Sequence, residues 1–177
     1  MRRLIHNCRV YPMERPVLEK GFVLLEGSTV CAVGGEDALP SGAFDQVIDG
    51  AGGYLLPGLV DAHTHIGLFN ESLRLEGEDG NEDTDPITPQ LRALDAVNPQ
   101  DRGFADARRA GVTTVVTGPG SANPIGGIFA AMKTRGVCAD RMLIREAAAM
   151  KLALGENPKI TYNGKERAPV TRMAWYT

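Results

Sequence analysis

An apolar run that ends in two histidines decides the fold: Pro57-Gly58-Leu59-Val60-Asp61-Ala62-His63-Thr64-His65. Side chains of a β-strand alternate between its faces, so a strand here predicts that Asp61, His63 and His65 share one face. Neutral imidazole nitrogens bind Zn²⁺ and similar ions at about 2.0–2.1 Å, and two on a rigid strand can share one ion. The chain has three histidines, of which two lie in this run. The run therefore predicts a metal site at the end of a strand.

The whole chain has the composition of an ordinary globular protein. Its 177 residues are 43% hydrophobic and 23% charged, and the net charge is −3. Without a basic excess, we expect neither nucleic acid nor an anionic membrane surface as a partner. No apolar run approaches the roughly 18 residues that span a bilayer, and the N-terminus lacks the apolar core of a secretion signal, so we expect a cytoplasmic protein. Three scattered cysteines without CxxC spacing predict buried thiols: Cys8, Cys31 and Cys138.

The pattern of the sequence changes after residue 56. Residues 1–56 consist of short β-rich runs separated by turns, which predicts a small all-β unit, and Gly27-Ser28 fits a tight hairpin turn. The strands that we expect there are Leu4-Ile5, Phe22–Glu26, Thr29–Val33 and Gln46–Asp49.

Residues 57–177 alternate apolar strands with helix-like segments, which predicts parallel strands joined by crossover helices. The β-branched run Val112–Thr117 is the clearest strand. The acidic segment Glu71–Asp85 predicts a long surface loop. We also expect helices over Arg102–Ala110 and Ile128–Arg135, and short strands over Met142–Ile144 and Met150–Leu154.

The stretch Leu56–His65 resembles the signature of the amidohydrolase superfamily, metal-dependent hydrolases that include imidazolonepropionase and dihydroorotase. The likeness continues in Gly111–Ser121 and Leu154–Lys159, which resemble the imidazolonepropionase-related branch. Residues 1–56 resemble the N-terminal part of the small β-sandwich that accompanies the barrel of many members. The resemblance implies an α/β fold in which residues 57–177 form part of a (β/α)₈ TIM-like barrel, with about three βα units.

The resemblance also implies the chemistry. The active site would lie at the carboxyl ends of the barrel strands, with His63 and His65 as ligands of a divalent metal, Zn²⁺ being the first choice. Such an ion acts as a Lewis acid and lowers the pKa of water toward about 7. The expected reaction is hydrolysis of the C–N bond of a small-molecule amide or cyclic amide. Asp61 would either orient the ligands or cap the turn.

A further ligand in the family is often an acid or a carboxylated lysine from a middle strand. Glu156 is the first candidate for this metal ligand, because it follows an apolar run whose carboxyl end would open into the site. Lys151 is its competitor, since a regular strand lets only one of the two face inward. The third alternative is that both residues serve loop packing. His6 is expected to be structural, and the turn Gly118–Ser121 either presents amides to an oxyanion or is only a turn.

The resemblance ends before the family's fold is complete. A full barrel takes about 250 residues, and residues 57–177 supply about half of that. No histidine follows His65, so the family's later ligands have no counterpart. We expect the chain alone to be an incomplete catalyst, and its open sheet edges predict a homo-oligomer. The alternative is a non-catalytic remnant or assembly piece of an amidohydrolase, without activity alone.

Overall fold

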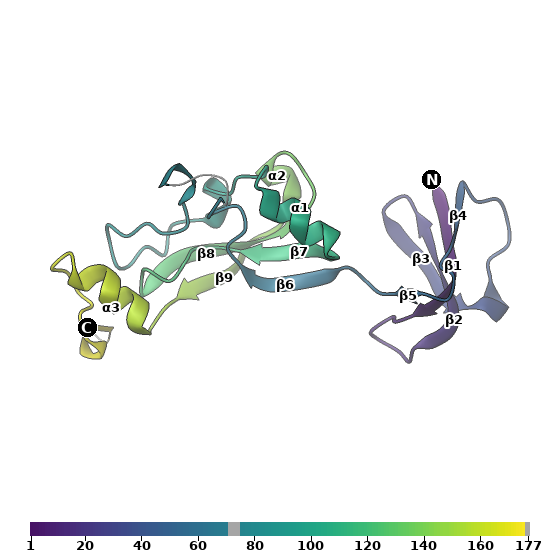
Figure 1. Ribbon diagram of the computed structural model, residues 1–177, viewed down its shortest axis with the longest axis horizontal. Coiled ribbons are helices and arrows are strands. Elements are labelled where there is room, and N and C mark those ends of the chain that lie inside the picture. Colours follow the sequence, from purple (N-terminus) through teal and green to yellow (C-terminus); the bar gives the residue numbers. More distant parts are fainter. Residues whose placement is uncertain (71–74, 176–177) are drawn as a thin grey trace. The chain divides into compact units, whose positions relative to one another are not determined.

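The computed structural model describes residues 1–70 and 75–175, and its contacts divide the chain into two units, Met1–Pro57 and Gly58–Thr177. This boundary falls one residue after the position expected from the sequence. Each unit is built on one β-sheet, so the fold is mixed α/β with little helix (Figure 1). Within the described ranges, no helix is long and apolar enough to cross a membrane.

The first unit is a five-stranded sheet with β1 at its centre. β1 pairs antiparallel with β2 and parallel with β4 and β5, which lie along successive parts of it. Gly27, with a φ of +61°, closes the β2–β3 hairpin, so the predicted turn and strands are confirmed. The elements are β1 (Arg2–Val10), β2 (Leu18–Glu26), β3 (Thr29–Gly35), η1 (Glu36–Ala38), β4 (Gln46–Asp49) and β5 (Tyr54–Leu55).

The two faces of this sheet differ in how well they are covered. Leu4, Phe22 and Leu24 are buried together on one face. Their neighbours in the strands point to the other face and line an apolar hollow of about 410 Å³ that includes Ile5 and Val23. The residues around this hollow are aliphatic or aromatic apart from Glu14 and Arg15 at its margin, and no histidine lines it.

The second unit is a four-stranded sheet in the order β6-β7-β8-β9. β6 and β7 are parallel, and the crossover between them contains α1. Asp101 caps α1, because its carboxylate accepts the Gly103 and Gly67 N–H groups at 2.9 and 2.8 Å. The predicted strand over residues 112–117 and the helix before it are confirmed. The elements are β6 (Leu59–Thr64), η2 (Leu75–Gly77), η3 (Ala93–Asp95), α1 (Arg102–Arg109), β7 (Val112–Thr117), β8 (Ile125–Lys133), α2 (Ala139–Met142), β9 (Leu143–Leu152), α3 (Glu156–Asn163) and η4 (Arg172–Trp175).

After β7 the sequence predictions are wrong for the helix and for the number of strands. The expected helix Ile128–Arg135 lies mostly in β8, and the two expected short strands are parts of one strand, β9. β7, β8 and β9 pair antiparallel, so they are not successive βα units. β8 lies between two strands and is buried on both faces, so its apolar run lacks the alternation by which a strand is recognised. Gly127, which directly precedes the expected helix, has a φ of +116° in a strand irregularity.

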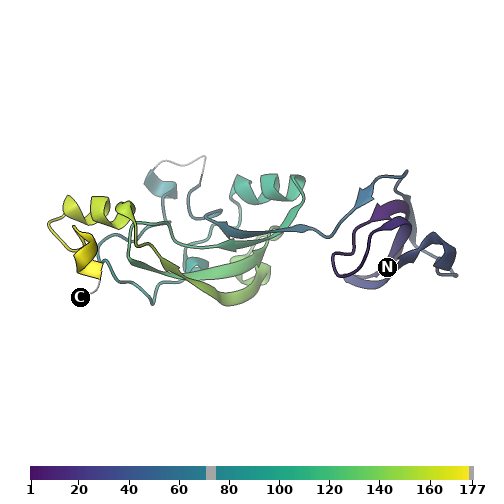
Figure 2. The ribbon, with the colours of Figure 1, turned by 90° about the horizontal axis from the view of Figure 1, so that it is seen from below.

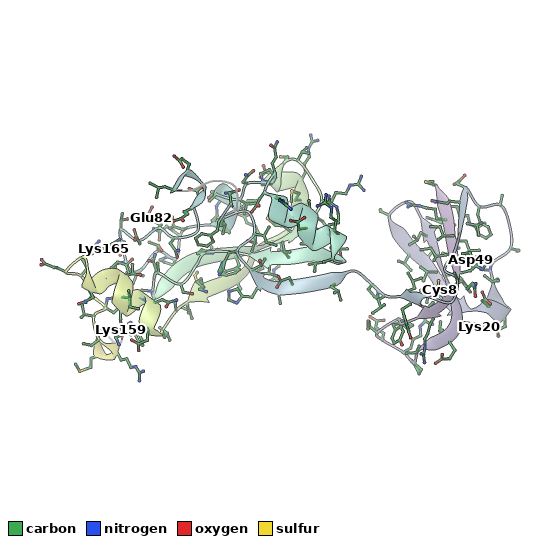
Figure 3. All side chains as sticks on the ribbon, viewed as in Figure 1. Cys8, Lys20, Asp49, Glu82, Lys159 and Lys165 are labelled. Carbon is green, nitrogen blue, oxygen red and sulfur yellow. The ribbon has the colours of Figure 1, made fainter. Side chains whose placement is uncertain are left out.

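The acidic segment is irregular, as predicted, but it is anchored to the sheet; its residues 71–74 lie outside the described residues. The buried Asn123 amide donates to the Glu82 carbonyl at 2.6 Å and to Thr88 Oγ1 at 2.9 Å. Asn123 Oδ1 accepts the Tyr162 hydroxyl of α3 at 2.6 Å. Figure 2 shows α3 at the end of the sheet where β9 finishes, and Figure 3 labels Glu82 and Lys165 at this same end. One amide therefore joins the loop, the sheet and α3.

We expect Tyr162→Phe to lower the free energy of unfolding by about 1–3 kcal/mol, because a buried acceptor loses its donor. Burial raises the pKa of Tyr162 to about 12. The phenol of the unfolded chain titrates near 10, so the stabilisation is complete below pH 10 and is lost as pH rises toward 12. Urea unfolding of both proteins between pH 8 and pH 12 measures this difference, and Tyr54→Phe, at a 68% exposed position, is the control. A difference that does not shrink above pH 10 would contradict the prediction.

Candidate active site

β6 delivers the two motif histidines to one place. His63 is the second-to-last residue of β6, and His65 directly follows the end of the strand. Their ring centres are 5.4 Å apart, and the rings meet edge to face at 84°. Asp61 Oδ1 accepts the backbone N–H of His63 at 3.1 Å, so this carboxylate supports the strand end. The two imidazoles lie beside each other, as the alternation of a strand requires.

The ring of His65 is oriented by a backbone carbonyl. Its Nδ1 lies 2.7 Å from the carbonyl oxygen of Gly118, directly after β7. A carbonyl oxygen only accepts, so Nδ1 carries the proton and the neutral ring keeps its Nε2 lone pair free. Metal-binding histidines are commonly oriented in this way.

The amides of the Gly118–Ser121 turn are already used within the fold. The Gly118 N–H donates to the Thr64 carbonyl at 3.3 Å, and the Gly120 N–H donates to the Gly80 carbonyl at 2.7 Å. These two amides are therefore committed to connecting strands and loops. Neither of these two amides is left for an oxyanion.

Lys151 lines the same hollow as His63. It is on β9 with 8% of its surface exposed, and its Nζ lies 6.0 Å from the ring centre of Phe129. Burial lowers the pKa of Lys151, which favours the neutral amine. A hollow of about 240 Å³ connects these groups, and its walls are Ala62, His63, Val116, Phe129, Ala149, Met150, Lys151 and Leu152.

Glu156 has different neighbours. It is the exposed first residue of α3, where its Oε2 lies 2.6 Å from Lys159 Nζ and its Oε1 lies 3.7 Å from Arg172. The hydrogen bond from Lys159 holds the pKa of Glu156 below its usual value. In the part of the chain that the structure describes, no three His, Cys, Asp or Glu side chains gather closely enough to hold a metal. The structure thus places Lys151, and not Glu156, in the hollow that His63 lines.

Sequence reasoning missed Phe129, because it assigned this residue to a helix. The side chain is 4% exposed, and its ring centre lies 5.3 Å from that of His63 and 6.3 Å from that of His65. The only signal for it was its place in the apolar run after Gly126-Gly127.

His6, Cys8 and Cys31 belong to the first unit. His6 has its Nδ1 3.6 Å from a Glu36 carboxylate oxygen. Cys8 is buried, and burial, together with the nearby carboxylate of Asp49 that Figure 3 labels, raises its pKa. The prediction of three buried thiols is wrong for Cys31, which is exposed near the β2–β3 hairpin, and for Cys138, which is only half-buried.

The fold is shared with a solved enzyme. The crystal structure of an amidohydrolase from Thermotoga maritima MSB8 matches 98% of this chain with a TM-score of 0.89 and 41% identity. The amidohydrolase tasK of Hapsidospora irregularis is 35% identical over 171 residues, or 86% of this chain. The chain belongs to the amidohydrolase superfamily. A 5-methylthioadenosine/S-adenosylhomocysteine deaminase from Syntrophomonas wolfei is 39% identical over 70 residues, or 38% of this chain.

This amidohydrolase-superfamily chain covers only part of each relative. It spans 44% of the solved chain, 17% of tasK and 16% of the deaminase. No family model matches it. The likeness to the solved amidohydrolase and to tasK confirms, at the level of the superfamily, the resemblance that begins at the histidine motif.

Proposed function

We propose that this chain supplies the first metal ligands of an amidohydrolase that hydrolyses the C–N bond of a small-molecule amide or cyclic amide. The observation that carries the proposal is the pair of adjacent imidazoles at the end of β6, with Lys151 lining the same hollow as His63. The names of the relatives, amidohydrolase and deaminase, support the C–N bond class. A match to a protein named imidazolonepropionase supports a place in that branch.

The donor set fits a divalent ion such as Zn²⁺. Imidazole nitrogens are preferred zinc ligands, and catalytic zinc sites use three protein ligands. His65 has its Nε2 free for this purpose, because Nδ1 is held by Gly118. For the third position we propose Lys151 rather than Glu156. In its deprotonated form, which burial favours, the Lys151 amine can attack carbon dioxide, forming an N–C bond and releasing a proton, and the carbamate then offers a carboxylate oxygen.

A bound divalent ion would supply Lewis-acid chemistry, polarising a carbonyl and bringing the pKa of water near about 7. The chain's own residues would hold the metal ion and shield the Lys151 amine from water. His63 and His65 present nitrogen lone pairs, and the Gly118 carbonyl fixes one ring. The apolar walls of the hollow limit the access of water to Lys151, and this burial lowers the pKa of its amine. We further propose that the parallel pair β6 and β7, joined through α1, belongs to the family's barrel.

We expect Lys151→Gln to weaken zinc binding by the chain at least about 10-fold, and Glu156→Gln to leave it unchanged. The two substitutions are matched, since each leaves a neutral amide. Competition with a chromogenic chelator in bicarbonate buffer measures the affinity, and ¹³C NMR with labelled bicarbonate detects the carbamate. Loss of zinc affinity in Glu156→Gln alone would return the third position to Glu156.

Metal analysis combined with light scattering tests the proposed function on the chain itself. About one equivalent of zinc, retained in the homo-oligomer that we propose, supports the hydrolase assignment. An assembly that takes up no metal supports the alternative of a non-catalytic remnant. The reaction class is then tested on the proposed longer enzyme, of which this chain would be the N-terminal part. Its hydrolysis of a panel of cyclic amides is measured before and after chelation of the metal.

A further inference from the structure

The centre of one aromatic ring lies within 6.3 Å of both imidazole ring centres and of the Lys151 amine. Phe129 projects from β8, a strand that carries none of the proposed ligands. Its ring meets that of His63 edge to face, at 85° and 5.3 Å between centres, and that of His65 at 51° and 6.3 Å. The amine of Lys151 lies 6.0 Å from the same ring centre.

The ring of Phe129 is itself fixed in place. It is 4% exposed, and Gly118 lies directly against it, since a Cβ on Gly118 would fall 2.2 Å from Phe129 Cγ. Gly118 is also the residue whose carbonyl holds His65 Nδ1. The ring and the peptide that orients His65 therefore form one packed layer, in which neither can move without the other.

We propose that Phe129 is the positioning residue of this site, whose ring sets the spacing and tilt of the His63 and His65 imidazoles. The effect of Phe129 on metal binding rests on the proposed function, whereas its effect on the two rings does not. His63 is exposed and has its ring packed edge to face against the rings of His65 and Phe129. Aromatic pairs prefer this geometry, and a phenyl ring offers no atom that competes for the metal. Phe129 thus replaces, for His63, the polar partner that orients most metal-binding imidazoles.

The test compares two leucine substitutions of equally buried rings in the same unit. Phe129→Leu removes the ring beside the histidines, whereas Phe104→Leu removes one, 2% exposed, in the core beneath α1. Phe129→Tyr restores the ring. Circular dichroism confirms folding, NMR of the metal-free chain records contacts between the His63 and His65 ring protons, and chelator competition gives the zinc affinity.

We expect Phe129→Leu to lose the contacts between the histidine ring protons and to bind zinc about 10–100-fold more weakly. Phe104→Leu and Phe129→Tyr should keep the contacts between the histidine ring protons. Their zinc affinity should stay within about threefold of that of the unsubstituted chain, as for sites whose ligand geometry is intact. Unchanged ring contacts in a folded Phe129→Leu overturn the inference, whether or not zinc binds. Should Phe129→Leu fail to fold, Phe129→Met is measured in the same way. An unsubstituted chain without zinc affinity but with ring contacts that depend on Phe129 defeats the proposed function and leaves this inference standing.

Discussion

The double substitution His63→Ala/His65→Ala is expected to abolish zinc binding, with a loss of affinity of at least about 100-fold. Removing outer partners of a metal ligand already costs about 10–100-fold, and here both imidazole ligands disappear. His63 is exposed and His65 is partly buried, so the fold should survive. The metal content after dialysis measures the loss of zinc, and circular dichroism shows whether the fold survives.

His6→Ala is the matched control, because His6 is the chain's third histidine and lies in the other unit. It should leave the zinc content unchanged. If the double variant kept a full equivalent of zinc, the metal would be elsewhere and the proposed site would be lost.

Gly118→Ala is expected to cost about 3 kcal/mol of unfolding free energy, at the upper end of ordinary overpacking. The added methyl would lie 2.2 Å from Phe129 Cγ, and the buried ring has nowhere to move. The strain should also shift the carbonyl that orients His65, so zinc affinity should fall with stability. Urea unfolding and chelator competition measure the two effects.

The control for this substitution is Gly164→Ala. Gly164 ends α3 with a φ of −69°, and a Cβ there would meet nothing within 4 Å. Its effect should stay within about 0.5 kcal/mol, as for most surface changes. Equal unfolding energies for the two alanine variants would show that the layer of Gly118 and Phe129 can adapt.

The pairing of His63 and His65 could be predicted from the sequence, because it depends on the period of a single strand. Alternation along β6 brings two side chains together without any knowledge of the remaining fold. The β2–β3 hairpin and the β-branched strand β7 were predictable for the same reason, since turn residues and side-chain branching are local signals.

The neighbours that other strands supply could not be predicted in this way. β8 lies between two partners, so its burial on both faces hides the period of a strand, and Phe129 was lost with it. Lys151 was ranked below Glu156 because the end of β9 was placed two residues too late. Which of the two lies by the histidines depends on the register between β8 and β9, where Gly127 pairs with Lys151. Registers between distant strands leave no mark on a single sequence.

The hydrogen bonds of the Asn123 amide also form in a set order during synthesis of the chain. Its loop partners, Glu82 and Thr88, precede it along the chain, whereas the hydroxyl of Tyr162 comes 39 residues later. A ribosome adds roughly 5–20 residues per second, so this last partner arrives roughly 2–8 seconds after the amide is made. Until then water must satisfy Asn123 Oδ1, and the end of the β6–β9 sheet stays hydrated on the nascent chain. The first unit has a comparable wait, because Asn7 of β1 donates to Asp49 Oδ1, which comes 42 residues later.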